Sequence, residues 1–180
     1  MAQFKAYSDG VEVNGETVLS VLEAMSVFRA QAEKILEENG LINPEPGKWY
    51  NQQAWLNAFK YIADEIGPNT LYSIGRKVPE SAQFPADIDS IEKALGAIDV
   101  AYNMNHRGGK IGHYSFELTG LKSAKITCNN PYPCDFDNGI IESMAKKFQP
   151  ADSIMVMVSH DTTASCRKNG ADSCIYKISW

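Results

Sequence analysis

The 180-residue sequence lacks any apolar run approaching the roughly 18 residues that a membrane span requires. Its first ten residues, MAQFKAYSDG, also lack the apolar segment of a secretory signal peptide. We therefore expect a cytoplasmic protein with no membrane span. Basic residues are not in excess, because 17 Lys and Arg stand against 22 Asp and Glu. The resulting net charge of −5 argues against a nucleic-acid partner.

Cysteine is scarce, with four residues in the chain, too few for a disulfide-stapled scaffold. The motifs of several enzyme classes are missing as well. There is no Gly-rich nucleotide-binding loop, and no Gly-x-Ser-x-Gly elbow accompanies the sequence Ser159-His160-Asp161. Neighbouring residues of a strand point to opposite faces, so these three cannot form a hydrolase triad among themselves. An enzyme is the less favoured interpretation.

The hydrophobic pattern changes its period once along the chain. In residues 1–108 apolar residues recur at steps of three and four, which indicates helices. We expect these helices over residues 17–39, 52–66, 71–78 and 88–102, with Asn51 and Asp87 as N-caps of the second and the last. In residues 109–180 the period is mostly two. There the expected elements are strands 111–118 and 124–128, helix 139–148, and strands 154–159 and 173–180.

This order predicts an α+β fold in one domain, residues 1–180. N-terminal helices would pack on a twisted antiparallel sheet, and residues 109–180 would form a C-terminal β-β-α-β-β unit. In such a unit a helix start and two strand ends can meet at one edge of the sheet. Cys134, His160, Cys166 and Cys174 lie at such places. Three thiolates and an imidazole are a complete tetrahedral set for Zn²⁺, although plain burial of thiols beside a turn is the interpretation that the residues alone favour.

Two stretches, PYPCDFDNGIIESMAKKF and VMVSHDTTASCRKNGADSCIYKISW, resemble the second half of a 4-vinyl reductase domain. The likeness covers roughly residues 111–180 and rests on Cys134 with Gly139, then Cys166, Gly170 and Cys174. It implies a relation to the haem-nitric-oxide-binding and transport-particle folds. It also implies that the three cysteines bind zinc, with His160 as the fourth ligand. Asp161 and Cys128 compete with His160 for that position.

The same resemblance implies a sensory or regulatory module that binds a hydrophobic or aromatic small molecule. Such a module would be a homodimer and would signal through a separate output protein. Two alternatives follow from the same relatives: an enzyme or accessory protein of tetrapyrrole metabolism, and a structural adaptor of the transport-particle type. Aromatic residues are numerous in the chain, and most are explained by core packing. If a pocket lies between helices and sheet, we expect its walls to be Trp55, Phe59, Tyr102, Tyr114 and Phe116.

Two further groups have ordinary explanations. His106 and His113 flank a glycine turn and could bind haem, but the Tyr-x-Ser-x-Arg motif of the haem-nitric-oxide sensors is absent. A histidine at a helix end more often interacts with the helix dipole, so the sequence favours a protein without haem. Asp135 and Asp137 lie at a predicted helix start, where the dipole explains them without acid-base catalysis.

Overall fold

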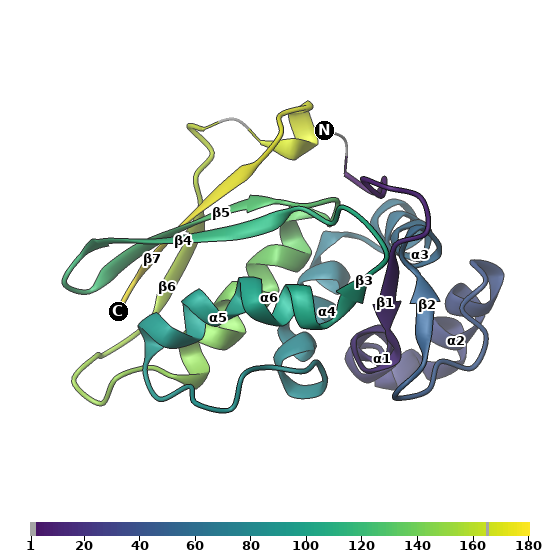
Figure 1. Cartoon of the computed structure of the whole chain (residues 1–180), viewed down its shortest axis with the longest axis horizontal. Helices are drawn as coiled ribbons and strands as arrows, with labels where there is room; N and C mark the ends of the chain where they lie inside the picture. Colours follow the sequence, from purple (N-terminus) through teal and green to yellow (C-terminus); the bar gives the residue numbers. More distant parts are fainter. Residues whose placement is uncertain (1–2, 165) are drawn as a thin grey trace.

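The computed structural model describes residues 3–164 and 166–180. It has helices in the first half and a sheet with one further helix in the second (Figure 1). The helices are α1 (Gly15–Ala24), α2 (Arg29–Glu38), α3 (Gln52–Glu65), α4 (Pro68–Ser81), α5 (Ile91–Met104) and α6 (Cys134–Lys147). The strands are β1 (Glu12–Asn14), β2 (Trp49–Asn51), β3 (His106–Arg107), β4 (His113–Gly120), β5 (Ser123–Asn129), β6 (Met157–His160) and β7 (Cys174–Ser179).

The predicted fold class is confirmed. The larger sheet is antiparallel, with strand order β4-β5-β7-β6, and α6 connects β5 to β6 to give the β-β-α-β-β unit. Helices α5 and α6 lie together beneath this sheet in Figure 1. Along β5 every second residue is buried, and Ala124, Ile126 and Cys128 form the inward row. This alternation is the period of two seen in the sequence.

Three short strands in the helical half escaped sequence-based prediction. They form a small antiparallel sheet of order β2-β1-β3, in which Val13 pairs with Tyr50 on one side and with His106 on the other. Strands of two or three residues are too short to display an alternating pattern. This sheet fixes the start of β3, and with it the backbone of His106.

The prediction of one continuous helix over residues 17–39 is wrong. It is two helices, α1 and α2, separated by a short 3₁₀ turn at Ser26–Phe28. A continuous helix would place Phe28 on the same face as the buried Val18 and Val21, whereas Phe28 is 64% exposed. The turn redirects the chain so that Val18 and Val21 of α1 and Ile35 of α2 all reach the core.

Other boundaries differ by a few residues. Asn51 caps α3 as predicted, its side chain accepting a hydrogen bond from the Ala54 N–H. The N-cap of α5 is Ser90 instead of Asp87, because the Ser90 hydroxyl accepts from the Lys93 N–H. Helix α4 continues through Pro79, which was expected in a loop. None of the helices within the described residues combines the length and the apolar character needed to cross a bilayer.

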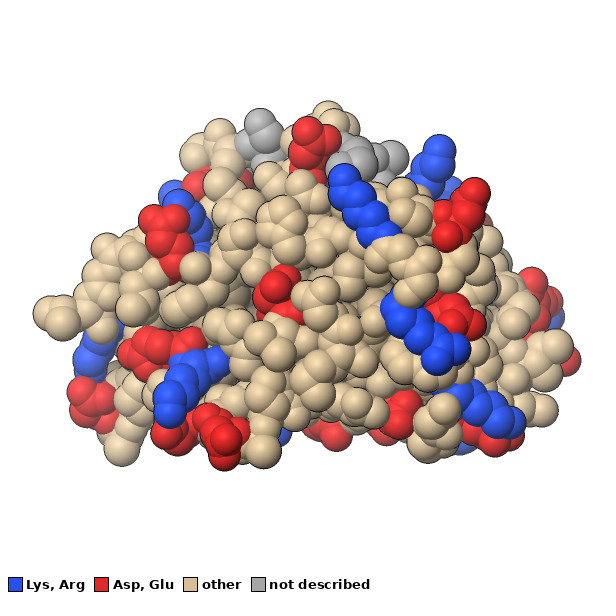
Figure 2. All heavy atoms as spheres, viewed as in Figure 1, with Lys and Arg blue, Asp and Glu red and all other residues tan. Residues whose placement is uncertain are grey.

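The surface carries charges of both signs. Figure 2 shows acidic and basic side chains interspersed over the face in view, without a continuous basic patch there. Many of the ion pairs join a lysine or arginine to an acid three or four residues away in the chain, as in Arg29–Glu33 and Lys60–Asp64. Exposed pairs of this kind contribute little to stability.

Helices α4 and α6 approach each other unusually closely because glycines lie at the crossing. A Cβ atom added to Gly75 of α4 would lie 2.1 Å from the carbonyl oxygen of Phe136. One added to Gly139 of α6 would lie 2.2 Å from the carbonyl oxygen of Tyr72. Both obstacles are backbone atoms, which cannot move aside without shifting a helix. The crossing therefore sets the position of α6, the helix that begins with Cys134.

We expect Gly75→Ala to destabilise the protein by about 1–3 kcal/mol or more, because the new methyl group overpacks the helix crossing. Gly96→Ala is the matched control in the middle of α5, where the nearest atom lies 3.7 Å from the added Cβ. That change should stabilise by roughly 0.5–1 kcal/mol through helix propensity alone. Urea unfolding of both variants measures the difference. Equal effects in the two would contradict the close approach of α4 and α6.

Candidate functional site

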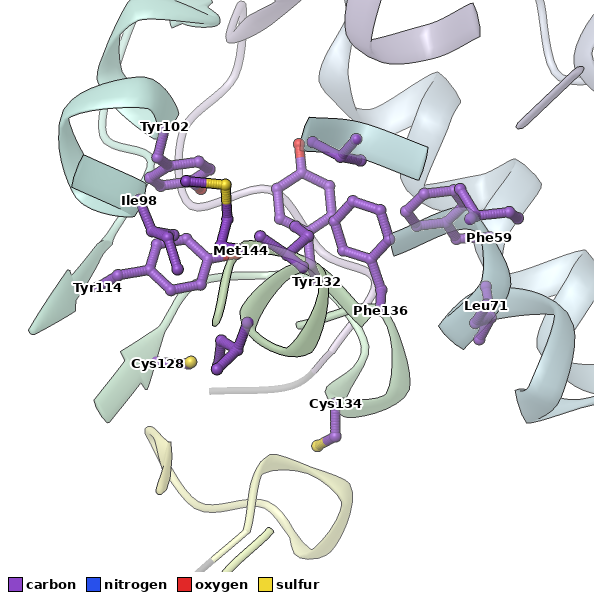
Figure 3. Close-up of a cluster of buried hydrophobic side chains, with 14 of the residues drawn as sticks. Phe59, Leu71, Ile98, Tyr102, Tyr114, Cys128, Tyr132, Cys134, Phe136 and Met144 are labelled. Atoms are coloured by element: carbon purple, nitrogen blue, oxygen red, sulfur yellow. The ribbon is translucent and has the colours of Figure 1, made fainter. Parts of the chain in front are cut away.

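An aromatic pocket lies between the helical half and the sheet. It encloses only about 40 Å³ of free space, well below the roughly 300–1,000 Å³ typical of small-molecule sites. Its aromatic lining is Trp55, Phe84, Tyr102, His106, Tyr114, Tyr132 and Phe136. The Tyr102, Tyr114, Tyr132 and Phe136 rings gather in Figure 3, with Tyr132 and Phe136 arising from the start of α6 and the loop before it.

His106 is the one titratable imidazole in this lining, and its side chain is 7% exposed. Its Nδ1 lies 2.8 Å from the Tyr102 carbonyl oxygen. A carbonyl can only accept, so Nδ1 carries the proton and Nε2 is left with a lone pair. The Tyr132 hydroxyl, 2.6 Å away, donates to that lone pair. Burial lowers the pKa of His106 to about 4, so the ring is neutral at physiological pH.

The predicted wall residues fall into two groups. Trp55, Tyr102 and Tyr114 line the pocket. Phe59 is fully buried behind Trp55, with ring centroids 4.6 Å apart, and Phe116 lies on β4 near Gly96. Neither phenylalanine is part of the lining. The indole N–H of Trp55 is buried and finds no hydrogen-bond partner among the described residues, so a donor remains available in the pocket wall.

The four predicted metal ligands meet at one place. One ligand atom each from Cys134, His160, Cys166 and Cys174 lies within 4.8 Å of all the others. The Sγ–Sγ distances are 3.1 Å for Cys134–Cys174, 3.5 Å for Cys134–Cys166 and 3.6 Å for Cys166–Cys174. A tetrahedral zinc with Zn–S bonds of about 2.3 Å separates its sulfurs by about 3.8 Å. The thiols therefore need only small displacements to surround an ion.

Each ligand comes from a different structural feature. Cys134 is the first residue of α6, His160 ends β6, Cys166 precedes the short 3₁₀ turn Arg167–Asn169, and Cys174 begins β7. His160 stacks on the Tyr176 ring, and its Nε2 is buried without a partner within residues 3–164 and 166–180. An unpartnered buried nitrogen beside three thiols is available as a fourth metal ligand. The competitors lie elsewhere: Cys128 is on β5 outside the group, and Asp161 pairs with Lys177.

Arg167 is the functional residue that sequence reasoning missed. Its side chain is fully buried, and its Nε and its backbone N–H each lie 3.3 Å from the Cys174 sulfur. A hydrogen bond from Cys134, aided by the Arg167 guanidinium, lowers the pKa of Cys174. A thiolate is the form that binds metals. Nothing in the local sequence distinguishes Arg167 from an ordinary exposed arginine, because its partners are remote along the chain.

Asp137 is the charge partner of Arg167, and both side chains are 0% exposed. Asp137 also accepts a hydrogen bond of 2.7 Å from the Tyr114 hydroxyl, which lines the pocket. Burial raises the pKa of Asp137, while Arg167 and Tyr114 oppose that rise. The two acids at the start of α6 thus have different environments, since Asp135 forms a partly exposed pair with Lys168. A buried polar network therefore runs from the pocket to the cysteines.

Pocket and cysteine group together describe an α+β ligand-binding fold with a candidate metal centre at the edge of its sheet. No family model and no curated protein matches the chain. Among solved structures, 26 chains match. One is an H-NOX protein from S. oneidensis in the Fe(II)NO ligation state, with a TM-score of 0.66 and 15% identity, covering 92% of this chain and 97% of that one.

Two further structures show the same likeness. An oxygen-binding H-NOX domain related to soluble guanylate cyclases has a TM-score of 0.64 and 14% identity, covering 92% of this chain and 91% of that chain. A third, described by the modulation of haem redox potential through porphyrin distortion, has a TM-score of 0.66 and 14% identity, covering 93% of this chain and 100% of that one. At these identities the likeness shows the fold: this chain has the fold of H-NOX domains.

Two expectations are corrected by these findings. The assignment to the 4-vinyl reductase family is wrong, because the matching structures named here are H-NOX domains and only a loose fold relation to the expected family remains. The expectation against haem is wrong as well, because the proteins that share the fold are described by their haem and its gas ligands. The sequence argument relied on one missing motif, and it did not foresee a neutral histidine in the pocket wall.

We expect Asp137→Asn to destabilise the protein by about 3–5 kcal/mol, because the change leaves the buried Arg167 charge without its partner. Asp135→Asn, two residues earlier in the same helical turn, is the matched control and should cost less than about 1 kcal/mol. Both variants lose a similar interaction with the helix dipole, so their difference isolates the buried pair. Guanidinium unfolding at neutral pH measures it, and a difference near zero would show that Arg167 has another partner.

Proposed function

We propose that this chain is a sensor domain that binds haem in the aromatic pocket, where His106 would hold the iron. The observation that carries the proposal is the state of His106, which is buried, neutral and held by its Nδ1–H while Nε2 faces other pocket residues. Metal-binding histidines characteristically donate their second ring N–H to a carbonyl or carboxylate in this way. When bound, haem would supply an iron that can take a small gas molecule; the S. oneidensis protein is in an Fe(II)NO ligation state and the second domain binds oxygen.

His106 is a suitable ligand for haem iron, but the free space of about 40 Å³ is too small for a porphyrin unless the lining side chains move apart. The lining is almost wholly apolar or aromatic, as a porphyrin face requires, and the Trp55 N–H remains available to a ligand. No lysine or arginine is part of this lining. Arg107 lies over the Trp49 ring and pairs with Glu12, while Arg76 lies near Tyr72. The pocket wall therefore offers no cation to pair with the haem carboxylates.

The lack of a lysine or arginine in the pocket lining supports a second candidate ligand. An uncharged aromatic ligand, without iron, would be compatible with a small apolar pocket whose polar groups are limited to hydroxyl, amide, imidazole and indole. The chain would then still be a small-molecule sensor. The organisation of residues 1–180 as one domain, homodimerisation and a separate output protein stay predictions. So do the tetrapyrrole-metabolism and adaptor alternatives.

Cys134, His160, Cys166 and Cys174 are proposed to hold a structural zinc. Their distances support this, as does the unpartnered His160 Nε2. A zinc here would join the start of α6 to the ends of β6 and β7, segments that are far apart in sequence. All four positions would be filled by protein, which is the arrangement of structural sites and leaves no open position for catalysis.

Titration of the purified protein with hemin tests the haem proposal. We expect a Soret band shifted from that of free hemin, and His106→Ala should weaken hemin binding on the order of tenfold or more. His113→Ala is the matched control, because His113 is exposed at the start of β4 and should leave the affinity unchanged. Equal affinity in the two variants would exclude His106 as the ligand. Failure of hemin to bind the wild-type protein would leave the uncharged aromatic ligand as the candidate.

Metal analysis of protein never exposed to chelator tests the zinc proposal. We expect about one equivalent of zinc per chain, and a strong chelator should remove it with loss of thermal stability. Cys134→Ser should lower the zinc content sharply. Cys128→Ser should not, because Cys128 is buried outside the group of four. Zinc below about a tenth of an equivalent in the wild-type protein would contradict the site.

A further inference from the structure

An N-terminal strap, residues Gln3–Tyr7, reaches the cysteine group from the other end of the chain. The Gln3 side-chain amide has its Nε2 2.8 Å from the Cys134 sulfur, across 131 residues of sequence. A metal-bound thiolate can only accept hydrogen bonds, and Nε2 is the donor end of the amide. Figure 1 shows the purple start of the described chain at the top of the molecule, close to the yellow turn that follows Cys166. The strap therefore places an N–H donor against the proposed metal site.

The strap is tied to the domain at several points. The Phe4 N–H donates to the Pro131 carbonyl oxygen at 2.8 Å, on the segment that leads into Cys134. Gln53, in the first turn of α3, holds the strap from the other side. Its Nε2 donates to the Phe4 carbonyl oxygen and its Oε1 accepts from the Ala6 N–H, both at 2.9 Å. The first residues of a domain are usually poorly ordered unless they are tied down in this way.

The backbone of the strap is strained at Phe4. Its φ angle is +65°, in the left-handed region that residues other than glycine seldom adopt. Such a conformation costs on the order of 1–3 kcal/mol and persists only where the surrounding structure holds it. Here the Phe4 side chain packs against the hydrophobic core, and its N–H and its carbonyl oxygen are both bonded. The bend at Phe4 therefore fixes where the preceding residue, Gln3, lies.

The sulfurs of the proposed metal site benefit from such donors. Three thiolates carry one negative charge more than a Zn²⁺ ion neutralises, and N–H groups directed at sulfur stabilise that excess charge. Arg167 supplies two donors to Cys174, because its Nε and its backbone N–H each lie 3.3 Å from that sulfur. Gln3 supplies one to Cys134. Two of the three sulfurs thus receive an N–H from a residue that is not itself a ligand.

We propose that Gln3 is a positioning residue of the metal centre, which donates a hydrogen bond to the metal-bound Cys134 thiolate and is held there by Gln53 through the strap. This inference rests on the proposed zinc site and is independent of haem. It requires no shift of α6, because Gln3 already lies within hydrogen-bond distance of the sulfur. Gln53 acts through the strap, since its bonds are to Phe4 and Ala6 and not to a ligand.

Zinc affinity, measured by competition with a chromophoric chelator, tests this role. Gln3→Leu keeps much of the size of the side chain and removes its N–H donors. It should weaken zinc binding about tenfold or more, as loss of an outer hydrogen-bond partner typically does. Gln53→Leu should weaken zinc binding in the same direction, although Gln53 lies on α3. The double variant should bind zinc little more weakly than Gln3→Leu alone, because both changes act through one hydrogen bond. Additive effects would contradict the role of the strap.

The spectrum of the Co²⁺-substituted protein separates a direct hydrogen bond from a general loss of stability. An N–H directed at a thiolate lowers the energy of the sulfur lone pairs. Gln3→Leu should therefore shift the thiolate-to-cobalt charge-transfer band to longer wavelength. Gln149→Leu is the matched control, because its Nε2 also donates to protein, to the Ser153 carbonyl oxygen at 2.8 Å, beyond the far end of α6. It should leave both the zinc affinity and the band unchanged.

Two negative results have different meanings. If Gln3→Leu matches Gln149→Leu in zinc affinity and in band position, the inference is overturned while the zinc site itself stands. A wild-type protein that binds no zinc would overturn both, and metal analysis of that protein identifies this outcome before any variant is compared.

Discussion

The buried ion pair between Arg167 and Asp137 is the interaction on which both candidate sites depend. Removing two charges from water is costly, and the cost is offset only when the remaining donors and acceptors are also satisfied. Arg167 meets that condition by bonding to Asn130 and to Cys174, and Asp137 by accepting from Tyr114. The pair therefore requires β4, the segment Asn130–Cys134, the start of α6 and the turn after Cys166 to be in place together.

This requirement explains why pocket and cysteines lie on either side of the first turns of α6. Cys134 begins the helix on the cysteine side, while Phe136 and Ile140 line the pocket. Asp137 lies between them in sequence and holds Arg167 from one side and Tyr114 from the other. The helix itself cannot shift freely, because Gly139 places its backbone directly against that of α4. One rigid helix start thus positions the side chains of both sites.

Sequence patterns predicted what depends on local periodicity. The alternation in β5, the cap at Asn51 and the β-β-α-β-β order all follow from short-range rules. The metal-ligand group was also within reach, because cysteine and histidine are rare enough that their places at element ends stand out. The pocket was only partly predictable: an aromatic residue on a helix face looks alike whether it lines a cavity, as Trp55 does, or lies behind it, as Phe59 does.

The missed features share a physical cause, since each is a polar contact between residues far apart in the chain. His106 meets Tyr132 across 26 residues, and Arg167 meets Asn130 across 37. Hydrophobic periodicity carries no information about such long-range pairs. A different fold with the same hydrophobic pattern would not bring these residues together.

The likeness to H-NOX structures likewise says more about the fold than about binding chemistry. A TM-score of 0.66 at 15% identity means that the apolar pattern, the strand order and the close helix contacts specify this fold through many different sequences. Binding chemistry depends instead on a few side chains, and those must be taken from this chain. Here they are a neutral histidine covered by the Tyr132 hydroxyl, and a group of three thiols and an imidazole of which Cys134 lies two residues after that tyrosine.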